Sequence, residues 1–404
     1  MKKTVLNLLP ATLLVPAIGI YFLLQACSTS PTQNQRLRLP GAKQSIDAGA
    51  FLSLQDAIDA LSEEGGLLKI PAGTFEIYEP LIIDKPDVQI EGAGTATHII
   101  NKNTEGMPAL LLRHPSYENS RESELWRISL LNFRITGNEQ SGHGIEARGI
   151  NEIFMHGITV SYHGGDGIML YYCYEDPRIT NSLITYNKGT GLNLIGCHDI
   201  IVSANQFEEN QDALQCTDGF NLCMTGNNLD DHLGNGVVIN NTYGSVLSGN
   251  MIEECAGTAI ILDKDCYGTT ISANVIAHNV SGGVELRDAH GCAVSANTFT
   301  IMGNDALNIG PESGRITVSS NNISNSYIGL DETKRIEDLN AGGIVLEGTT
   351  DICVVGNLIS SVRPKALELR GEPSERVNFS GNVITDAQSD QENLKNSVVK
   401  INLN

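Results

Sequence analysis

Apolar residues along this chain fall in short alternating stretches, and the stretches recur at a nearly constant spacing. Gly, Asn, Asp or Ser separates one stretch from the next, which is typical of short β-strands joined by turns. In the most regular stretch a Gly or Ala precedes apolar residues two positions apart, as in Ile168/Leu170 and Leu192/Leu194. A repeat in the twenties indicates a solenoid. The pattern therefore predicts a stacked coil of β-structure rather than a series of helix pairs.

A recurring asparagine marks the period, with successive gaps of 24, 22, 23, 24, 23, 24, 36 and 25 residues. Its local frame repeats, as in Val202-Ser-Ala-Asn205-Gln-Phe207, and Asn132 and Gly157 take its place in earlier coils. A stack of side-chain amides bonded along the solenoid axis explains the period without a ligand, so we interpret the column as structural. The asparagines are Asn181, Asn205, Asn227, Asn250, Asn274, Asn297, Asn321, Asn357 and Asn382.

The repeat predicts about thirteen coils between residues 67 and 404. Each coil buries its apolar face only against its neighbours, so we expect one elongated domain rather than two or three. The widest gap, between Asn321 and Asn357, leaves about twelve extra residues, which include the charged stretch 331–338. We expect that stretch to form a loop that leaves the solenoid and could wall a groove.

A short helix over about residues 53–62 is predicted from Ser53-Leu-Gln-Asp56, with an apolar face that contains Leu54, Ala57, Ile58 and Leu61. Gly65-Gly, Pro71-Ala-Gly-Thr and Val88-Gln-Ile-Glu-Gly follow. Together with the asparagine column, this passage resembles the N-terminal entry of the pectate-lyase-like superfamily. The resemblance covers most of residues 45–404. It implies a single-stranded right-handed parallel β-helix, all-β, with a capping helix over the open end of the first coil.

The N-terminus predicts export. Lys2 and Lys3 precede an apolar stretch that ends in Leu24-Gln-Ala-Cys27, which resembles the signal of a bacterial lipoprotein. We expect a leader of residues 1–26, a lipid on Cys27, a tether of residues 27–45 and a β-helix domain of residues 46–404. An uncleaved membrane anchor is the alternative, because the apolar stretch is long enough to span. Ser28 resembles the signal for the outer membrane of a Gram-negative bacterium, so we predict a cell-envelope lipoprotein.

The net charge limits the possible binding partners, and the spacing of the cysteines indicates one disulfide. The net charge of −21 becomes −23 once a leader with two lysines and no acids is removed, so nucleic acid is not an expected partner. Of nine cysteines, Cys173 and Cys197 each lie eight residues before a column asparagine and should stack on adjacent coils. We therefore predict a disulfide between them. The other thiols besides Cys27 are interpreted as core residues; no Cys/His spacing indicates zinc.

Strand alternation also predicts which side chains face outward, because the residues between two inward positions must point to solvent. The first outward column is Glu146, Met169, Asn193, Gln215, Val238, Ile261, Glu285, Asn308, Val345 and Glu368. The second is Arg148, Tyr171, Ile195, Thr217, Asn240, Asp263, Arg287, Gly310, Glu347 and Arg370.

One candidate site on this face combines Asp263, Asp265, Glu285, Arg287 and Asp288 from two adjacent coils. Pectate lyases hold Ca²⁺ with Asp and Glu and use Arg or Lys as the base. The resemblance therefore implies a possible Ca²⁺ site at Asp263, Asp265 and Glu285, with Arg287 beside it. The alternative is a stacked network of ion pairs on a solvated sheet.

A second candidate site places His143, Asp166 and Asp212 before the first inward residue of their strands, with Glu146, Arg148 and Tyr171 on the adjacent strands as substrate-binding residues. Asp166 and Asp212 lie two coils apart, roughly 9–10 Å, near the upper end of the carboxyl separation in inverting glycosidases. The alternative is ordinary turn chemistry, in which Asp before Gly accepts backbone N–H groups. The pieces resemble polygalacturonase motifs but occur in another order, so that assignment is rejected.

The leading interpretation is an envelope-tethered, monomeric protein that acts on an extended polysaccharide as a lyase, hydrolase or C5-epimerase. Mannuronan epimerases share the fold, yet their Asp-Pro-His-Asp motif is missing, and Glu175-Asp-Pro-Arg178 only resembles it. The rival interpretation is a non-catalytic β-helix that binds glycan or forms part of the envelope. Outward apolar residues such as Met169 and Val238 are consistent with that rival.

Overall fold

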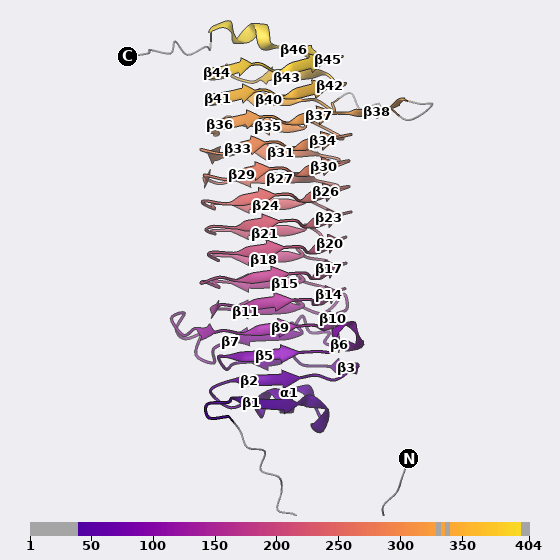
Figure 1. Ribbon diagram of the computed structural model, residues 1–404, viewed down its shortest axis with the longest axis vertical. Helices are drawn as coiled ribbons and strands as arrows, with labels where there is room; N and C mark the ends of the chain where they lie inside the picture. Colours follow the sequence, from indigo (N-terminus) through magenta and orange to yellow (C-terminus); the bar gives the residue numbers. More distant parts are fainter. Residues whose placement is uncertain (1–38, 329–332, 336–339, 397–404) are drawn as a thin grey trace, which may run out of the picture. The chain divides into compact units, whose positions relative to one another are not determined.

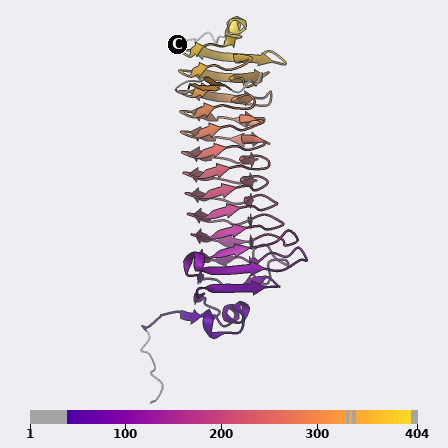
Figure 2. The ribbon, with the colours of Figure 1, turned by 90° about the vertical axis from the view of Figure 1, so that its right-hand side faces the viewer.

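The computed structural model describes residues 39–328, 333–335 and 340–396, and residues 43–404 group as one unit. Within that unit, thirteen coils of three strands each stack into three parallel sheets, and β1 adds one more strand before the first coil (Figure 1). Figure 2 shows the same stack turned by 90°. The predicted all-β solenoid and its coil count are confirmed.

Each coil contributes one strand to every sheet, in the order sheet 1, sheet 2, sheet 3. Sheet 1 contains β1 (Gln44–Asp47), β2 (Gly66–Lys69), β5 (Val88–Glu91), β9 (Ser129–Leu131), β13 (Phe154–His156), β16 (Arg178–Thr180), β19 (Ile201–Ser203), β22 (Cys223–Thr225), β25 (Val246–Ser248), β29 (Thr270–Ser272), β33 (Ala293–Ser295), β36 (Gly314–Ser319), β41 (Thr350–Val355) and β44 (Glu375–Ser380), with β28 (Cys266–Tyr267) and β32 (Ala289–His290) joined at its edge. Sheet 2 contains β3 (Gly73–Ile77), β6 (Thr97–Asn101), β10 (Arg134–Thr136), β14 (Thr159–Ser161), β17 (Leu183–Thr185), β20 (Gln206–Glu208), β23 (Asn228–Asp230), β26 (Met251–Glu253), β30 (Val275–Ala277), β34 (Thr298–Thr300), β37 (Asn322–Ser324), β42 (Leu358–Ser360) and β45 (Val383–Thr385). Sheet 3 contains β4 (Leu81–Ile83), β7 (Leu110–Arg113), β11 (Ile145–Arg148), β15 (Ile168–Tyr171), β18 (Leu192–Ile195), β21 (Leu214–Thr217), β24 (Val237–Asn240), β27 (Thr258–Asp263), β31 (Gly282–Leu286), β35 (Leu307–Ile309), β40 (Ile344–Glu347), β43 (Lys365–Arg370) and β46 (Gln388–Ser389).

The asparagine column is a buried ladder of hydrogen bonds at the turn between sheets 1 and 2. In each rung the side-chain oxygen of one Asn accepts from the backbone N–H and the side-chain amide of the Asn one coil earlier, as Asn250 does from Asn227 at 3.0 and 2.9 Å. The ladder runs without a break from Asn205 to Asn382. Its predicted structural role is confirmed.

The first predicted rungs are wrong by one residue. Ser182, not Asn181, occupies the ladder column, because the Ser182 N–H donates to the Asn205 oxygen at 3.0 Å. Asn181, Asn132 and Gly157 all precede the column and have φ of 49°, 57° and 64°. Asn and Gly are the residues that tolerate this left-handed conformation best, so an Asn that makes the turn looks like a ladder Asn in the sequence.

The predicted capping helix is α1 (Leu54–Asp59), and the Ser53 hydroxyl accepts from the Asp56 N–H at 3.0 Å. Leu54, Ala57, Ile58 and Leu61 are buried. Gln55 bonds both the N–H of Ile82 and its carbonyl, at 2.8 and 3.2 Å. The helix therefore covers the end of the core and pairs backbone groups at the first strand of sheet 3, which an open solenoid would leave exposed.

Smaller elements lie at turns and at the ends of the stack. They are η1 (Ala48–Ala50), η2 (Gly94–Ala96), η3 (Gln391–Asn396), the pair β8 (Leu125–Trp126) and β12 (Ile150–Asn151), and the antiparallel pair β38 (Ser326–Ile328) and β39 (Thr333–Arg335). β39 falls inside the predicted loop at 331–338, and the remainder of that stretch is outside the described residues, as are the predicted leader and Cys27. Among the described residues, no helix has the length and apolar character needed to cross a membrane.

Candidate functional site

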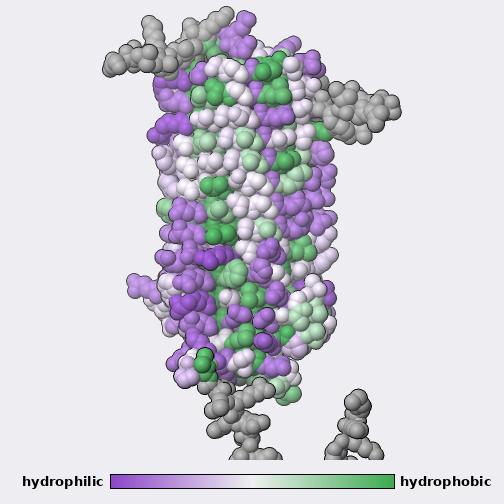
Figure 3. Space-filling model, in the orientation of Figure 1, coloured by the Kyte–Doolittle hydropathy of each residue, from purple (hydrophilic) through white to green (hydrophobic). Residues whose placement is uncertain are grey.

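The outer face of sheet 3 has the register that strand alternation predicts. Glu146 pairs with Met169, Met169 with Asn193, and the first outward column continues in this way to Glu368. The second column pairs in register from Arg148 to Asp263. Figure 3 shows one side of the solenoid, on which polar and apolar residues are interspersed rather than gathered into one large apolar patch.

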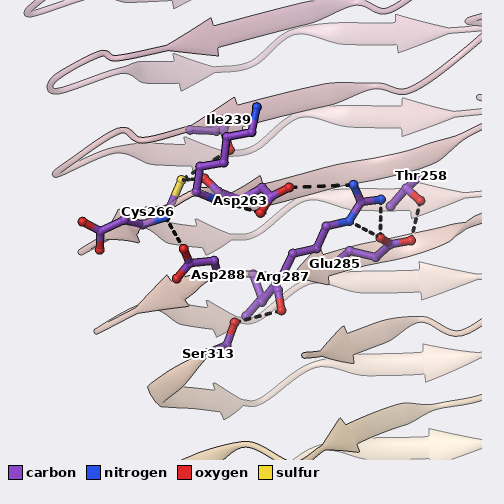
Figure 4. A network of polar contacts seen from close by, with 11 residues as sticks. Ile239, Thr258, Asp263, Cys266, Glu285, Arg287, Asp288 and Ser313 are labelled. Atoms are coloured by element: carbon purple, nitrogen blue, oxygen red, sulfur yellow. Dashed lines mark hydrogen bonds and ion pairs between the residues drawn. The ribbon is translucent and has the colours of Figure 1, made fainter. Parts of the chain in front are cut away.

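Arg287, Glu285 and Asp263 come together on this face (Figure 4). The Arg287 guanidinium lies 2.7 Å from the Glu285 carboxylate through one terminal nitrogen and 2.8 Å through Nε, and 4.0 Å from Asp263. The other Glu285 oxygen accepts from the Thr258 hydroxyl at 2.8 Å. Glu285 is therefore held on both oxygens, by a charged and a neutral donor.

Asp265 and Asp288 do not join this group. Lys264 and Asp265 have φ of 57° and 61°, so two consecutive left-handed residues interrupt the alternation after β27. Asp265 accepts from the Tyr243 hydroxyl at 3.0 Å, and its N–H donates to Asp288 at 2.7 Å. Both carboxylates thus serve the turn between sheets 3 and 1 rather than the outer face of sheet 3.

The predicted Ca²⁺ ligands accordingly do not converge. Asp265 points away from Asp263, and both oxygens of Glu285 already have partners. Among the described residues, the group of three or more possible ligands whose atoms all lie within 4.8 Å of one another is Asp230, Asp231 and Glu254, at the edge of sheet 2. That cluster could hold a metal ion, since oxygen ligands of this kind suit Ca²⁺.

A depression of about 210 Å³ lies beside Arg287. Asn308 is in register with Glu285 one coil earlier and Val345 one coil later, and its side-chain oxygen is buried without a hydrogen-bond partner. Two carboxylates, Glu285 and Glu347, lie two coils apart on its rim. The lining residues are Glu285, Leu286, Arg287, Asn308, Gly310, Pro311 and Glu347.

Sequence reasoning mapped Asn308 and Glu347 to the outward columns but did not select them. Both residues could have been selected because they lie in register close to Glu285, whereas the presence of a depression there could not be read from the register. Arg370 was mapped and passed over in the same way. It lies 2.8 Å from Asp305 and 2.9 Å from Glu368.

Asp305 is the most buried carboxylate of this region, with 6% of the residue exposed. Burial raises its pKa above the ordinary value, although the hydrogen bond from Arg370 opposes the shift. The pKa of Arg370 is raised in turn, chiefly by its hydrogen bond to Glu368. Arg370 therefore links its own coil to the coil of Asp305, with the coil of β40 between them.

Asp166 and Asp212 form part of the turn that precedes each strand of sheet 3. One oxygen of Asp166 accepts from the Thr190 N–H at 2.8 Å, and one oxygen of Asp212 accepts from the Asn235 N–H at 2.5 Å. Their other oxygens accept from the outward amides of Asn193 and Gln215, at 3.0 and 2.7 Å. These bonds favour the turn interpretation over an inverting pair of carboxylates.

Neighbouring groups in this turn column agree with that interpretation. His143 accepts from the Asp166 N–H at 3.0 Å and lies 3.4 Å from the carboxylate. Gly189 and Gly234 face the oxygens of Asp166 and Asp212, where an added Cβ would lie only 2.4 Å away. The Asp and Gly types in this column are therefore required by the packing of one coil on the next.

Glu146, Arg148 and Tyr171 do form one group. Arg148 Nε donates to Glu146 at 2.5 Å, and its guanidinium lies 5.6 Å from the Tyr171 ring centroid. Two arginines that sequence reasoning missed complete it: Arg113 is in register with Arg148, and Arg121 donates to the Tyr171 hydroxyl at 3.3 Å. Arg113 could have been found from the register, but Arg121 comes from the loop before β8.

The predicted disulfide is not formed, because Cys173 and Cys197 are free thiols. Each is buried on its own coil, and the thiols donate to the carbonyls of Ala147 and Leu170 at 3.7 and 3.5 Å. Equivalent positions on adjacent strands are about 4.8 Å apart. That spacing is within the Cα separation that a disulfide allows, but each thiol is directed at a backbone carbonyl instead of at the other thiol.

Comparison with known proteins identifies the fold. The family described as the right handed beta helix region matches residues 88–242, 172–323 and 258–402. The A-module of mannuronan C-5 epimerase AlgE6 from Azotobacter vinelandii is similar with a TM-score of 0.61 and 17% identity, over 84% of this chain and 99% of that one.

Two further solved structures are similar at lower identity. A mutant of the periplasmic alginate epimerase AlgG has a TM-score of 0.54 and 11% identity, over 86% of this chain and 84% of its own. A mutant of DFA-IIIase from Arthrobacter chlorophenolicus A6, in complex with DFA-III, has a TM-score of 0.53 and 11% identity, over 82% and 100%. No curated protein matches the chain. At such identities the likeness concerns the fold.

Proposed function

Since the chain belongs to the right-handed β-helix family, we propose that it acts on an extended polysaccharide by acid–base chemistry at the depression on the outer face of sheet 3. The observation that supports this most is the pair of carboxylates, Glu285 and Glu347, on the rim of one depression. The face is a continuous series of parallel strands along which a linear chain could lie. The similar epimerases and DFA-IIIase are named for actions on carbohydrate.

Hydrolysis is the reaction that these residues suit best. Hydrolysis of a glycosidic bond needs two carboxyl groups on either side of the bond, one to protonate the leaving oxygen and one to activate water or attack the sugar. Glu285 is positioned by Arg287 and Thr258, whereas the ion pairs that the described residues form around the depression do not include Glu347. We propose Glu347 as the acid and Glu285 as the base, with Arg287 as a positioning residue.

A lyase or C5-epimerase is the second candidate. Both reactions remove the proton beside a uronate carboxylate, which must first be neutralised by a cation. The arginine at the depression, Arg287, is already paired with Glu285 and lies near Asp263. A uronate would therefore require added Ca²⁺, and this requirement distinguishes the two candidates.

A polysaccharide screen tests the proposal. The purified protein is incubated with neutral glycans and with uronate glycans, each with Ca²⁺ and with a chelator, and the products are assayed for new reducing ends and for unsaturated ends. Hydrolysis predicts reducing ends without unsaturation and without a need for Ca²⁺. Unsaturated ends that depend on Ca²⁺ would favour the lyase instead. If no glycan yields any product, the protein is a binding or scaffold component of the envelope.

We also propose that the protein is tethered to the envelope through a lipid on Cys27 and works there as a monomer. The supporting observation is the sequence around Cys27, with its small preceding residue and polar tether. A Cys27→Ser variant should appear in the soluble fraction, whereas the wild type stays with the outer membrane. Equal partition of the two proteins would remove the lipid anchor from the proposal.

A further inference from the structure

Aromatic rings line the turn between sheets 3 and 1 over successive coils. Backbone bridges pair His198 with Phe220, Phe220 with Tyr243 and Tyr243 with Tyr267. The pairing of β28 with β32 brings Tyr267 beside His290. Tyr174 extends the line at its N-terminal end through a ring contact with His198. We call the following residues the aromatic strip: Tyr174, His198, Phe220, Tyr243, Tyr267 and His290.

The rings of the strip contact one another in sequence. Centroid separations are 4.6 Å from Tyr174 to His198, 4.7 Å from His198 to Phe220, 5.5 Å from Phe220 to Tyr243 and 6.5 Å from Tyr243 to Tyr267. The first two contacts are edge-on, with interplanar angles of 64° and 66°. An edge-on contact covers only one face of a ring, and Phe220 and Tyr243 stack at 17°, so the surface that a ligand could reach is the exposed part of the rings.

The strip lies outside the core. Phe220 and Tyr267 are 43% and 46% exposed, while Cys197 and Cys266, which directly precede two strip residues, are fully buried. Aromatic residues make up only 5% of this chain. A role in core packing would place such large rings inside, so their alignment along an exposed line calls for another explanation.

Hydrogen-bonding groups accompany the rings on both sides. Asn221 donates to Asp199 at 2.8 Å on one side, and Asn241 donates to Asp218 at 2.8 Å on the other. The Tyr243 hydroxyl donates to Asp265. Carboxylates and amides beside an aromatic face suit the hydroxyls and the C–H surface of a sugar ring. The carboxylates of Asp199, Asp218 and Asp265 disfavour a polyanion along most of the strip. Among the described residues, the one cation found over a strip ring is Arg315, 5.8 Å from the Tyr267 centroid.

We propose that the aromatic strip binds an extended neutral glycan whose axis runs along the solenoid, with about one sugar ring per coil. The coil spacing of about 4.8 Å is close to the length of one sugar unit in an extended chain. Tyr171 and Tyr172 connect the strip to the outer face of sheet 3, through ring contacts of 4.6 Å between them and 6.2 Å from Tyr172 to Tyr174. The inference rests on the proposed function and narrows its substrate class to neutral glycans.

Affinity electrophoresis of the full chain tests this inference, because migration through a gel that contains polysaccharide reports binding without turnover. The probes are glucomannan, xyloglucan, galactan and inulin as neutral glycans, with alginate and polygalacturonate as acidic ones. We expect at least one neutral glycan to retard the wild type, and the Phe220→Ala/Tyr267→Ala double variant to bind about tenfold more weakly. Phe220→Tyr/Tyr267→Phe, which keeps both rings, should restore retention if the rings themselves bind.

The matched control is Tyr162→Ala. Tyr162 is 53% exposed and stacks on Tyr186 at 5.0 Å, but on the turn between sheets 2 and 3. It should leave retention unchanged, and a thermal melt of each variant excludes unfolding. Equal retention of the double variant and the wild type, retention by acidic glycans alone, or none by any probe would each overturn the inference. Because retention is measured apart from the release of reducing ends, its result is distinct from success or failure of the proposed reaction.

Discussion

The asparagine ladder and the outer face of sheet 3 are built on the same coils but follow different rules. Inside, one residue type repeats from Asn205 to Asn382, and every rung has the same partners. Outside, the first column changes character at each coil, from Asn193 to Val238 to Glu285. The interior must satisfy buried amides in every coil, whereas the exterior is free to vary. Catalytic residues should therefore be sought at coils whose outward residues differ from those of the adjacent coils.

The largest expected effect comes from breaking the ladder. Asn250→Ala removes the acceptor of the Asn227 N–H and the donor to the Met224 carbonyl. Leaving such buried groups unpaired should lower the free energy of unfolding by about 3 kcal/mol, measured by denaturant titration. The control is Asn228→Ala at the adjacent position, whose half-buried side chain bonds only Gln206. A similar loss in both variants would contradict the special role of the ladder.

A second inner column, at the turn between sheets 2 and 3, predicts acid sensitivity. It uses Asn187 and Asn210, then His232, whose Nδ1 accepts from the Asn210 N–H at 3.2 Å. Burial lowers the pKa of His232 to about 4. The unfolded chain takes up a proton below pH about 6.5 while the folded chain does not, so stability is full above that pH and falls as the pH drops toward 4.

The expected slope from His232 is about 1.4 kcal/mol per pH unit in that window. His163, in the same column, has its pKa lowered by burial to about 3 and adds a similar slope. His232→Asn should remove the part due to His232, because Asn is the residue that other coils use there. Thermal melts between pH 4 and 7 measure this difference. Parallel curves for the variant and the wild type would show that His232 is protonated in the folded protein.

On the outer face of sheet 3, unlike in the ladder, we expect a substitution to affect activity more than stability. Arg287→Ala should change the free energy of unfolding by less than about 1 kcal/mol, since the guanidinium is half exposed. The same change should lower the rate of glycan cleavage by on the order of tenfold or more, because Glu285 loses its positioning partner. Arg287→Lys should recover part of that rate. Initial rates of glycan cleavage and melting temperatures of the variants measure the two effects. A large loss of stability with an unchanged rate would contradict the expected role of Arg287.

The smallest expected effect lies on the outer face of sheet 2, where carboxylates stack without arginines. Glu208, Asp230 and Glu253 are in register on successive strands. Burial raises the pKa of Glu253, and Asp230 adds to the shift. Glu253→Gln should therefore stabilise the protein by about 0.5 kcal/mol near neutral pH, because like charges directly opposite each other are destabilising. No change, or a loss, in the melting temperature would indicate that another group already neutralises the stack.

The sequence allowed the coil count, the inward residues and the register of the outward columns to be predicted, because alternation and period fix them once one strand is placed. The predicted solvent exposure was wrong for Met169, Ile261 and Val345 of the first column, which are buried. Prediction failed where the backbone leaves that regularity. Left-handed residues moved the first rung from Asn181 to Ser182 and turned Asp265 away from Asp263. Alternation assigns a face only to residues within a strand, so turn conformations cannot be obtained from it.

The candidate site was predicted only in part for a related reason. Glu285, Arg287 and Asp263 were expected together because they share a face and adjacent coils. The depression beside them is lined by residues of three coils, from Glu285 through Asn308 to Glu347. Arg121 reaches the face from a loop whose path no repeat specifies. The shape of this surface arises from packing across several coils, so it cannot be predicted from the residues of a single repeat.

The rate of reducing-end release by wild type, Glu285→Gln and Glu253→Gln tests the account most directly. The two variants make the same change at equivalent outward positions on two different sheets. We expect a loss of about 100-fold or more for Glu285→Gln and a rate close to wild type for Glu253→Gln. Equal rates for all three proteins would contradict a catalytic role for the outer face of sheet 3.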